Sequence, residues 1–196
     1  MDEVDKTVAA YEEILPAFLR QNEQFDMGEQ IEWFRKYLHG KKILDIGCGP
    51  GRDSEAFNRL GFEVTGIDFT ISFVKMAQER VPERKFWRMD MRKLQFKGEE
   101  FDGLWCLASF IHIPKREGLE TLQGFYRVLK RGGALFIGVK KGDGEGWMEK
   151  FGQERFYAYY QEEELQKLLE SIGFKVKETY NRKVGYDWIN IIAIKE

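Results

Sequence analysis

Residues 43–54 read ILDIGCGPGRDS, and this stretch decides the fold class. A short, largely apolar run (ILDI) is followed by three glycines at alternating positions and then by a charged segment that favours a helix. Glycine has no Cβ atom, so it permits positive φ angles and lets the backbone approach a ligand closely. A strand, a glycine-rich turn and a helix in this order are typical of the first unit of an open α/β sheet.

Alternating strands and helices continue to about residue 140. Strands are expected at 42–46, 62–67, 85–89, 101–107 and 134–139, with helices at 52–60, 71–80 and 115–129. This alternation predicts a doubly wound, mostly parallel sheet with helices on both faces. After a helix at 162–172, two strands at 174–180 and 188–195 are joined by few residues and must pair antiparallel. We therefore expect an α/β fold with a seven-stranded sheet whose last strand is antiparallel.

The whole chain, residues 1–196, is expected to form a single domain, because it contains no internal repeat and no low-complexity segment. Residues 1–40 are expected to be an N-terminal helical cap, which Pro16 bends or splits. Residues 41–140 are the predicted cofactor-binding core. Residues 141–196 are expected to hold a glycine-rich loop (KGDGEGW) that acts as a mobile lid on the substrate side, a helix and a terminal hairpin.

Composition narrows the class of protein. With 196 residues, of which 43% are hydrophobic, the chain can bury one sizeable core. A net charge of −2 offers no bulk positive field for nucleic acid or an anionic membrane. No apolar run reaches membrane-spanning length and the first residues lack a signal-peptide pattern, so a cytoplasmic protein is expected. Two cysteines and two histidines, far apart in sequence, predict no metal site.

Two familiar glycine-rich motifs do not fit residues 45–52. The dinucleotide fingerprint GxGxxG needs a third glycine where Arg52 stands, and the Gly-Lys-Ser/Thr ending of a P-loop is absent. What remains is GxGxG preceded by the acidic residue Asp45. A carboxylate beside the loop would repel a diphosphate and attract an ammonium or sulfonium group.

The stretch DIGCGPG resembles motif I of the class I S-adenosylmethionine-dependent methyltransferases. Residues 41–140 as a whole resemble the core of that family, small-molecule enzymes in particular. The supporting stretches are VTGID, FWRMD, RVLKRGGALFIG and FDGLWCLASFIHIP, the last of which is similar to motif IV. The resemblance implies S-adenosylmethionine as cofactor, S-adenosylhomocysteine as product, and a methyl acceptor as substrate.

The resemblance also implies a cofactor site. Asp68 closes a strand 19 residues after Gly49 and is expected to accept both ribose hydroxyls, with Phe69 against the adenine; a helix N-cap is the alternative. Asp90 and the backbone of Met91 are expected beside the adenine amino group. The full set of expected cofactor-binding residues is Asp45, Gly47, Cys48, Gly49, Gly51, Arg52, Asp68, Phe69, Asp90, Met91 and Leu107.

Catalysis of methyl transfer requires positioning and, for a hydroxyl or thiol acceptor, a base. His112 is the candidate base because an imidazole titrates near neutral pH. The alternatives are that it orients the helix starting near Pro114 or packs under the cofactor. Tyr11, Ser109 and Tyr157 are expected to contact the substrate. Lys140, Lys141 and Glu145 are weaker candidates for contact with a charged substrate.

A small-molecule methyltransferase is the leading functional hypothesis. A tRNA-modifying methyltransferase is the first alternative, although basic clusters are sparse. A non-catalytic cofactor-binding subunit is the second, since a fold can persist after its chemistry is lost. A dehydrogenase is the weakest, because the dinucleotide fingerprint fails.

Overall fold

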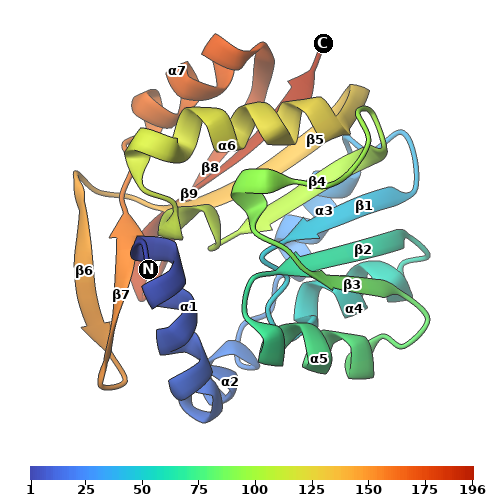
Figure 1. The fold of residues 1–196 in the computed structure, drawn as a ribbon. Helices are drawn as coiled ribbons and strands as arrows, with labels where there is room; N and C mark the ends of the chain where they lie inside the picture. The colour runs from blue at the N-terminus through green and yellow to red at the C-terminus, as the bar shows by residue number, and fades with distance from the viewer.

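The computed structural model describes residues 1–196, and its centre is a seven-stranded sheet, which Figure 1 shows. The strands are β1 (Lys42–Ile46), β2 (Glu63–Asp68), β3 (Lys85–Arg88), β4 (Phe101–Leu107), β5 (Leu129–Lys140), β8 (Phe174–Val184) and β9 (Tyr186–Lys195). Their order is β3-β2-β1-β4-β5-β9-β8, and β9 runs antiparallel to both of its neighbours while β1 to β5 pair in parallel. The predicted mostly parallel sheet with an antiparallel last strand is confirmed.

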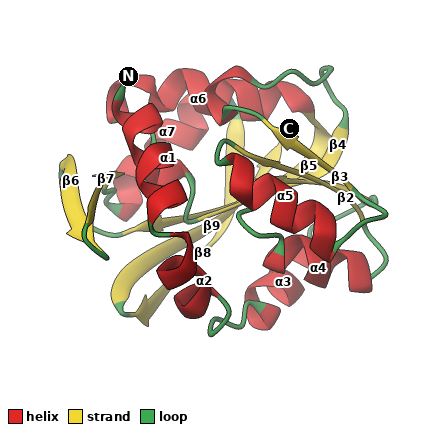
Figure 2. Ribbon diagram, turned by 60° about the horizontal axis from the view of Figure 1, so that its bottom comes forward, coloured by secondary structure: helices red, strands yellow, loops and turns green.

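Helices cover both faces of the sheet (Figures 1 and 2). They are α1 (Glu3–Glu13), α2 (Leu15–Asn22), α3 (Gly28–Arg35), α4 (Arg52–Arg59), α5 (Ile71–Arg80), α6 (Lys115–Val128) and α7 (Glu162–Ile172), with 3-10 turns η1 (Met91–Lys93) and η2 (Phe110–His112). Alternate residues of a strand point to opposite faces. On β4, Leu104 therefore joins the core under α6 and α7, whereas Trp105 packs with α3 and α4.

The N-terminal cap is divided as its sequence predicts. Helix α1 ends at Glu13, and α2 begins at Leu15 with Pro16 in its first turn, where proline's missing N–H costs no hydrogen bond. A capping box fixes the start of α1, in which Asp2 accepts from the Asp5 backbone N–H at 2.9 Å. Helix α1 lies beside the carboxyl ends of the parallel strands (Figure 1).

The region after β5 differs from the expected glycine-rich loop. A second, two-stranded sheet forms there from β6 (Glu145–Lys150) and β7 (Gln153–Ala158). Phe151 and Gly152 make the turn with φ angles of 61° and 78°. The hairpin packs on α1, where the Phe156 N–H donates to Thr7 Oγ1 at 3.0 Å. This tertiary contact stabilises the two strands. The sequence did not predict them, because the segment is short and contains several glycines.

Candidate active site

A cavity of about 730 Å³ opens at the carboxyl ends of β1, β2, β4 and β5. Ligands of open α/β sheets bind at this edge, and small-molecule pockets typically have this size. The core strands and their loops form one wall. Helices α1 and α2, the segment from α2 into α3, the β6–β7 hairpin and the end of the β8–β9 hairpin supply most of the other residues that line the cavity. No group of His, Cys, Asp or Glu side chains has the arrangement needed to hold a metal ion.

The glycine loop after β1 is tightly packed on two sides and open at its tip. A Cβ atom at Gly47 would lie 2.2 Å from the Cβ of Ser109, and one at Gly51 would lie 2.9 Å from Ala77. Gly49, with φ of 53°, has no atom within 4 Å of the Cβ position. Gly51 supports the approach of α4 to α5 and does not line the cavity. Gly49 is the position that leaves room for a ligand.

Asp68 lies at the end of β2 and lines the cavity. Its Oδ2 accepts from the Gly49 N–H at 2.9 Å, and its Oδ1 accepts from the Thr70 N–H at 2.8 Å. Burial raises the pKa of this carboxyl, and these backbone donors oppose the rise. A carboxylate offers about four acceptor positions. Each oxygen of Asp68 therefore keeps one position for a ligand hydroxyl.

Asp45 and Asp53 form a buried acidic pair under the glycine loop. Asp45 accepts from the Ser54 hydroxyl at 2.6 Å. Asp53 accepts from Arg52 Nε at 2.7 Å and from Trp105 Nε1 at 3.0 Å. Burial, and next the neighbouring Asp53, raise the pKa of Asp45 to about 8. Both acids line the cavity, so a cationic ligand group would find a carboxylate there.

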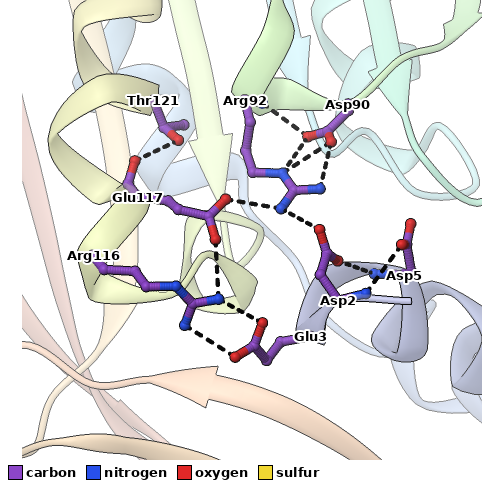
Figure 3. Close-up of polar contacts among 8 residues, drawn as sticks. All are labelled: Asp2, Glu3, Asp5, Asp90, Arg92, Arg116, Glu117 and Thr121. Atoms are coloured by element: carbon purple, nitrogen blue, oxygen red, sulfur yellow. Dashed lines mark hydrogen bonds and ion pairs between the residues drawn. The ribbon is translucent and has the colours of Figure 1, made fainter.

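Asp90 also lines the cavity, but its carboxylate is already held by Arg92 (Figure 3). Oδ1 accepts from the Arg92 N–H and Nε, and Oδ2 accepts from Nε and Nη2, at distances of 2.7–3.1 Å. These bonds fill the acceptor positions of a carboxylate. The adenine amino group would have to replace one of them at Asp90 or use the adjacent backbone of Met91.

The same arginine ties the cap to the core. Arg92 Nη1 donates to Asp2 at the start of α1 and to Glu117 on α6, both at 2.8 Å. Arg116 on α6 forms a second link, with two bonds to Glu3 at 3.0 and 2.7 Å (Figure 3). We call Asp2, Glu3, Arg92, Arg116 and Glu117 the cap latch.

His112 and Tyr11 form a hydrogen-bonded pair at the cavity. His112 Nδ1 lies 2.6 Å from the Phe156 carbonyl oxygen; because that oxygen only accepts, Nδ1 carries the proton. Nε2 then accepts from the Tyr11 hydroxyl at 2.9 Å. Burial lowers the pKa of His112 to about 3, so the imidazole is neutral and weakly basic. The Tyr11 hydroxyl therefore occupies the one ring nitrogen of His112 that can accept a proton.

The other sequence-predicted residues are placed as follows. Cys48, Arg52, Phe69, Met91 and Leu107 line the cavity. Ser109 and Tyr157 line it too, but the Ser109 hydroxyl donates to the Ile46 carbonyl at 2.7 Å and so ties β4 to β1.

Sequence reasoning missed several polar residues of the cavity wall: Gln30, Arg155, Arg182 and Asn190. Arg155 and Asn190 are each 3% exposed. A single arginine that opens the aromatic run RFYAYY was the available signal for the first of them.

Comparison with known proteins agrees with this architecture. Residues 43–133 match the methyltransferase-domain family. A demethylmenaquinone methyltransferase from Renibacterium salmoninarum is 27% identical over 141 residues, which cover 68% of this chain and 58% of the relative. A ubiquinone biosynthesis O-methyltransferase from Actinobacillus pleuropneumoniae is 35% identical over 110 residues, covering 51% and 46%. The chain thus spans about half the length of the curated relatives it matches.

One solved structure similar to this chain is the 1,6-didemethyltoxoflavin-N1-methyltransferase of Burkholderia thailandensis, with its substrate and S-adenosylhomocysteine bound. The match covers 96% of this chain and 87% of that enzyme, with a TM-score of 0.72 and 22% identity. This likeness shows that the two proteins share a fold. The fold is that of the Rossmann-like methyltransferases. Residues 43–133 match the methyltransferase-domain family, and over this part the chain is similar to the class I S-adenosylmethionine-dependent methyltransferases.

No helix of the structure combines the length and apolar character needed to cross a membrane.

Proposed function

We propose that this protein transfers a methyl group from S-adenosylmethionine to a small-molecule acceptor and releases S-adenosylhomocysteine. The observation that carries the proposal is Asp68. It lies at the end of β2 with one acceptor position left on each oxygen, next to the open space at Gly49. That geometry suits the two vicinal hydroxyls of a ribose.

The remaining cavity residues fit the other parts of the same cofactor. Phe69 and Met91 would lie beside the adenine, with Asp90 near its amino group, and Asp45 would face the positively charged methionine end. Gly47, Cys48, Gly49, Arg52 and Leu107 would complete this wall, and Gly51 would hold the loop in place by packing. When bound, the cofactor supplies a sulfonium methyl group, an electrophile with a neutral leaving group.

The chain's own contribution to the chemistry would be orientation and proton removal. Holding the acceptor atom in line with the methyl group provides much of the acceleration of such a transfer. For a hydroxyl or thiol acceptor, the proton would leave through Tyr11, whose own hydroxyl donates to His112. His112 is neutral and able to accept it, although its lowered pKa makes it a weak base.

A small acceptor is supported by the lining of the cavity and by the relatives. Helix α1 and the β6–β7 hairpin contribute residues to the cavity, and relatives named for demethylmenaquinone, ubiquinone biosynthesis and 1,6-didemethyltoxoflavin act on small molecules. The net charge of −2 speaks against tRNA as the acceptor. Residues 1–196 would act as one domain of cap, core and substrate-side region. Both cysteines are free thiols, in keeping with a cytoplasmic location.

The test is to follow the label from methyl-labelled S-adenosylmethionine in three mixtures: a metabolite extract, bulk RNA, and protein alone. Label in a small product supports the proposal. Label in RNA would favour the tRNA-modifying alternative, and binding without any labelled product would favour a non-catalytic subunit.

A further inference from the structure

Four cationic side chains line the part of the cavity formed by the later strands. They are Lys140 at the end of β5, Lys150 at the end of β6, Arg155 in β7 and Arg182 in β8. Strand β4 divides the sheet, with β1, β2 and β3 on one side of it and β5, β9 and β8 on the other. Asp45 and Asp68 lie in β1 and β2, and Asp90 lies in the loop that follows β3. Lys140 and Arg182 therefore lie on the side of the cavity away from the proposed ribose and adenine positions. Lys150 and Arg155 belong to the separate β6–β7 sheet, and Arg155, like Lys140, faces the ring of Tyr157.

Arg155 is buried without a counter-charge. Its residue is 3% exposed, and Nε and Nη2 are buried with no hydrogen-bond partner. The guanidinium instead faces the ring of Tyr11, 4.8 Å from its centroid, and the ring of Tyr157 at 5.7 Å. Ring faces attract a cation but do not replace the oxygen acceptors that a buried guanidinium needs. Nε and Nη2 form the side of a guanidinium that binds two oxygens of one anion at once. Protein atoms cover that side here, so an anion in the cavity reaches it only after the Arg155 side chain turns.

Lys140 is buried in a similar way. It is 5% exposed, and its Nζ lies 3.8 Å from the ring centroid of Tyr157 and 3.9 Å from that of Tyr186. Lys150 Nζ donates to the neutral side chain of Gln21 at 2.7 Å. Burial, then the nearby charges of Lys150 and Arg155, lower the pKa of Lys140 to about 8. The charges that shift this lysine are all positive.

No carboxylate of the chain neutralises this group. None of the four cations forms an ion pair. Burying several like charges together is unfavourable unless a bound anion compensates them. The single carboxylate of the cofactor's methionine part can pair with only part of this group, so a neutral acceptor would leave the other cations unpaired.

We propose that the methyl acceptor carries a compact anionic group, a carboxylate or a phosphate, which binds to Arg155 with Lys140 and Lys150 around it. This inference rests on the proposed function, because it assigns the anion to the acceptor. Arg155 would pair with two oxygens of the group, the lysines would add charge, and the rings of Tyr11 and Tyr157 would contact the rest of the molecule. Arg155 and Lys140 lie inside the cavity, which favours a small anion over the backbone of a nucleic acid.

The test is calorimetric titration of the full chain, saturated with S-adenosylhomocysteine, with benzoate, phenyl phosphate and the neutral benzamide at constant ionic strength. At least one anion is expected to bind about tenfold or more tightly than benzamide. The tighter of the two anions distinguishes a carboxylate substrate from a phosphate one.

Variants connect this binding to the cations. Arg155→Gln and Lys140→Gln are each expected to weaken anion binding about tenfold or more, while the affinity for S-adenosylhomocysteine stays unchanged and shows that the variants fold. Arg155→Lys keeps the charge but loses the paired donors, so an intermediate affinity is expected. Arg59→Gln, a change at an exposed arginine of α4, is the matched control and is expected to alter neither affinity.

The inference is overturned if neither anion binds more tightly than benzamide, or if Arg155→Gln binds the anion as well as the native chain does. A native chain that fails to bind S-adenosylhomocysteine contradicts the proposed function instead. The same titrations into ligand-free protein then still decide whether these cations form an anion site.

Discussion

Asp45 is the residue whose titration reports most directly on the charge of the bound ligand. Burial and the adjacent Asp53 raise its pKa to about 8, so it holds a proton at pH 7 in the ligand-free protein. A cationic ligand stabilises the carboxylate and lowers this pKa. We therefore predict that S-adenosylmethionine binding at pH 7 releases up to about one proton, and that the release declines as the pH rises above about 8.

The measurement is calorimetry at pH 7 in two buffers that differ in ionisation enthalpy. The observed binding enthalpy should depend on the buffer for the native chain and not for Asp45→Asn. Equal enthalpies in both buffers for the native chain would mean that Asp45 does not respond to the cofactor.

Tyr11 is the residue through which a proton would leave the cavity. Tyr11→Phe removes only the hydroxyl that donates to His112 Nε2. We predict that kcat falls about 100-fold, within the range lost when a proton-transfer group is removed, while cofactor affinity is retained.

Tyr126→Phe is the matched control. It removes a tyrosine hydroxyl that lies outside the cavity and donates to the Glu196 carbonyl oxygen, so kcat should not change. Steady-state kinetics of both variants test whether the effect is specific to Tyr11. A Tyr11→Phe enzyme with native kcat would limit Tyr11 and His112 to positioning helix α1.

At the scale of elements, the cap latch holds α1 against η1 and α6. Arg92 is 14% exposed and links Asp2, Asp90 and Glu117, whereas Arg116 is 56% exposed. We predict that Arg92→Ala costs about 1–3 kcal/mol of unfolding free energy and increases amide hydrogen exchange in α1. Arg116→Ala should cost less than about 1 kcal/mol, because exposed ion pairs contribute little.

Denaturant unfolding and hydrogen exchange on the two variants test this ranking. The account of the latch is contradicted if α1 stays as protected in Arg92→Ala as in the native chain, or if the two substitutions cost the same.

Local sequence patterns were sufficient for the sheet and its helices. An apolar run precedes Gly47, and the spacing of apolar residues changes after each glycine that ends a helix. These patterns predict β1 to β5 and α4 to α6, and most of their ends agree with the structure to within a few residues. The start of β5 at Leu129 and the β6–β7 hairpin were not predicted. The hairpin depends on contact with α1, more than 130 residues away in sequence, and such contacts leave no local periodicity.

The candidate site was predictable where it follows strand ends, and less so elsewhere. Asp45, Asp68 and Asp90, which all line the cavity, were predicted because each lies within two residues of the end of a parallel strand, and such ends meet at one edge of a sheet. The engagement of Asp90 by Arg92 was not visible, because it depends on side-chain packing. Arg155 was missed because its burial requires the hairpin and α1 to come together, whereas an arginine in sequence is usually solvated.

The molecule as a whole separates its charges within one cavity. Although the net charge of the chain is only −2, its cavity is lined by acids at the ends of β1, β2 and β3 and by four cations on β5, β6, β7 and β8. A donor with a positive centre and an acceptor with a negative group would each find opposite charge, and so would be oriented toward one another. The N-terminal cap and the β6–β7 hairpin also line this cavity, and both lie outside residues 43–133, which match the family.

Calorimetric titration of the full chain with S-adenosylhomocysteine, alongside Asp68→Ala and the exposed control Asp143→Ala, tests the central claim most directly. The native chain and the control are expected to bind alike. Asp68→Ala should lose about 3 kcal/mol, or about 100-fold in affinity, because two hydrogen bonds to a carboxylate disappear. No detectable binding to the native chain, or equal binding to Asp68→Ala, would contradict the assignment of this cavity to the methyl donor.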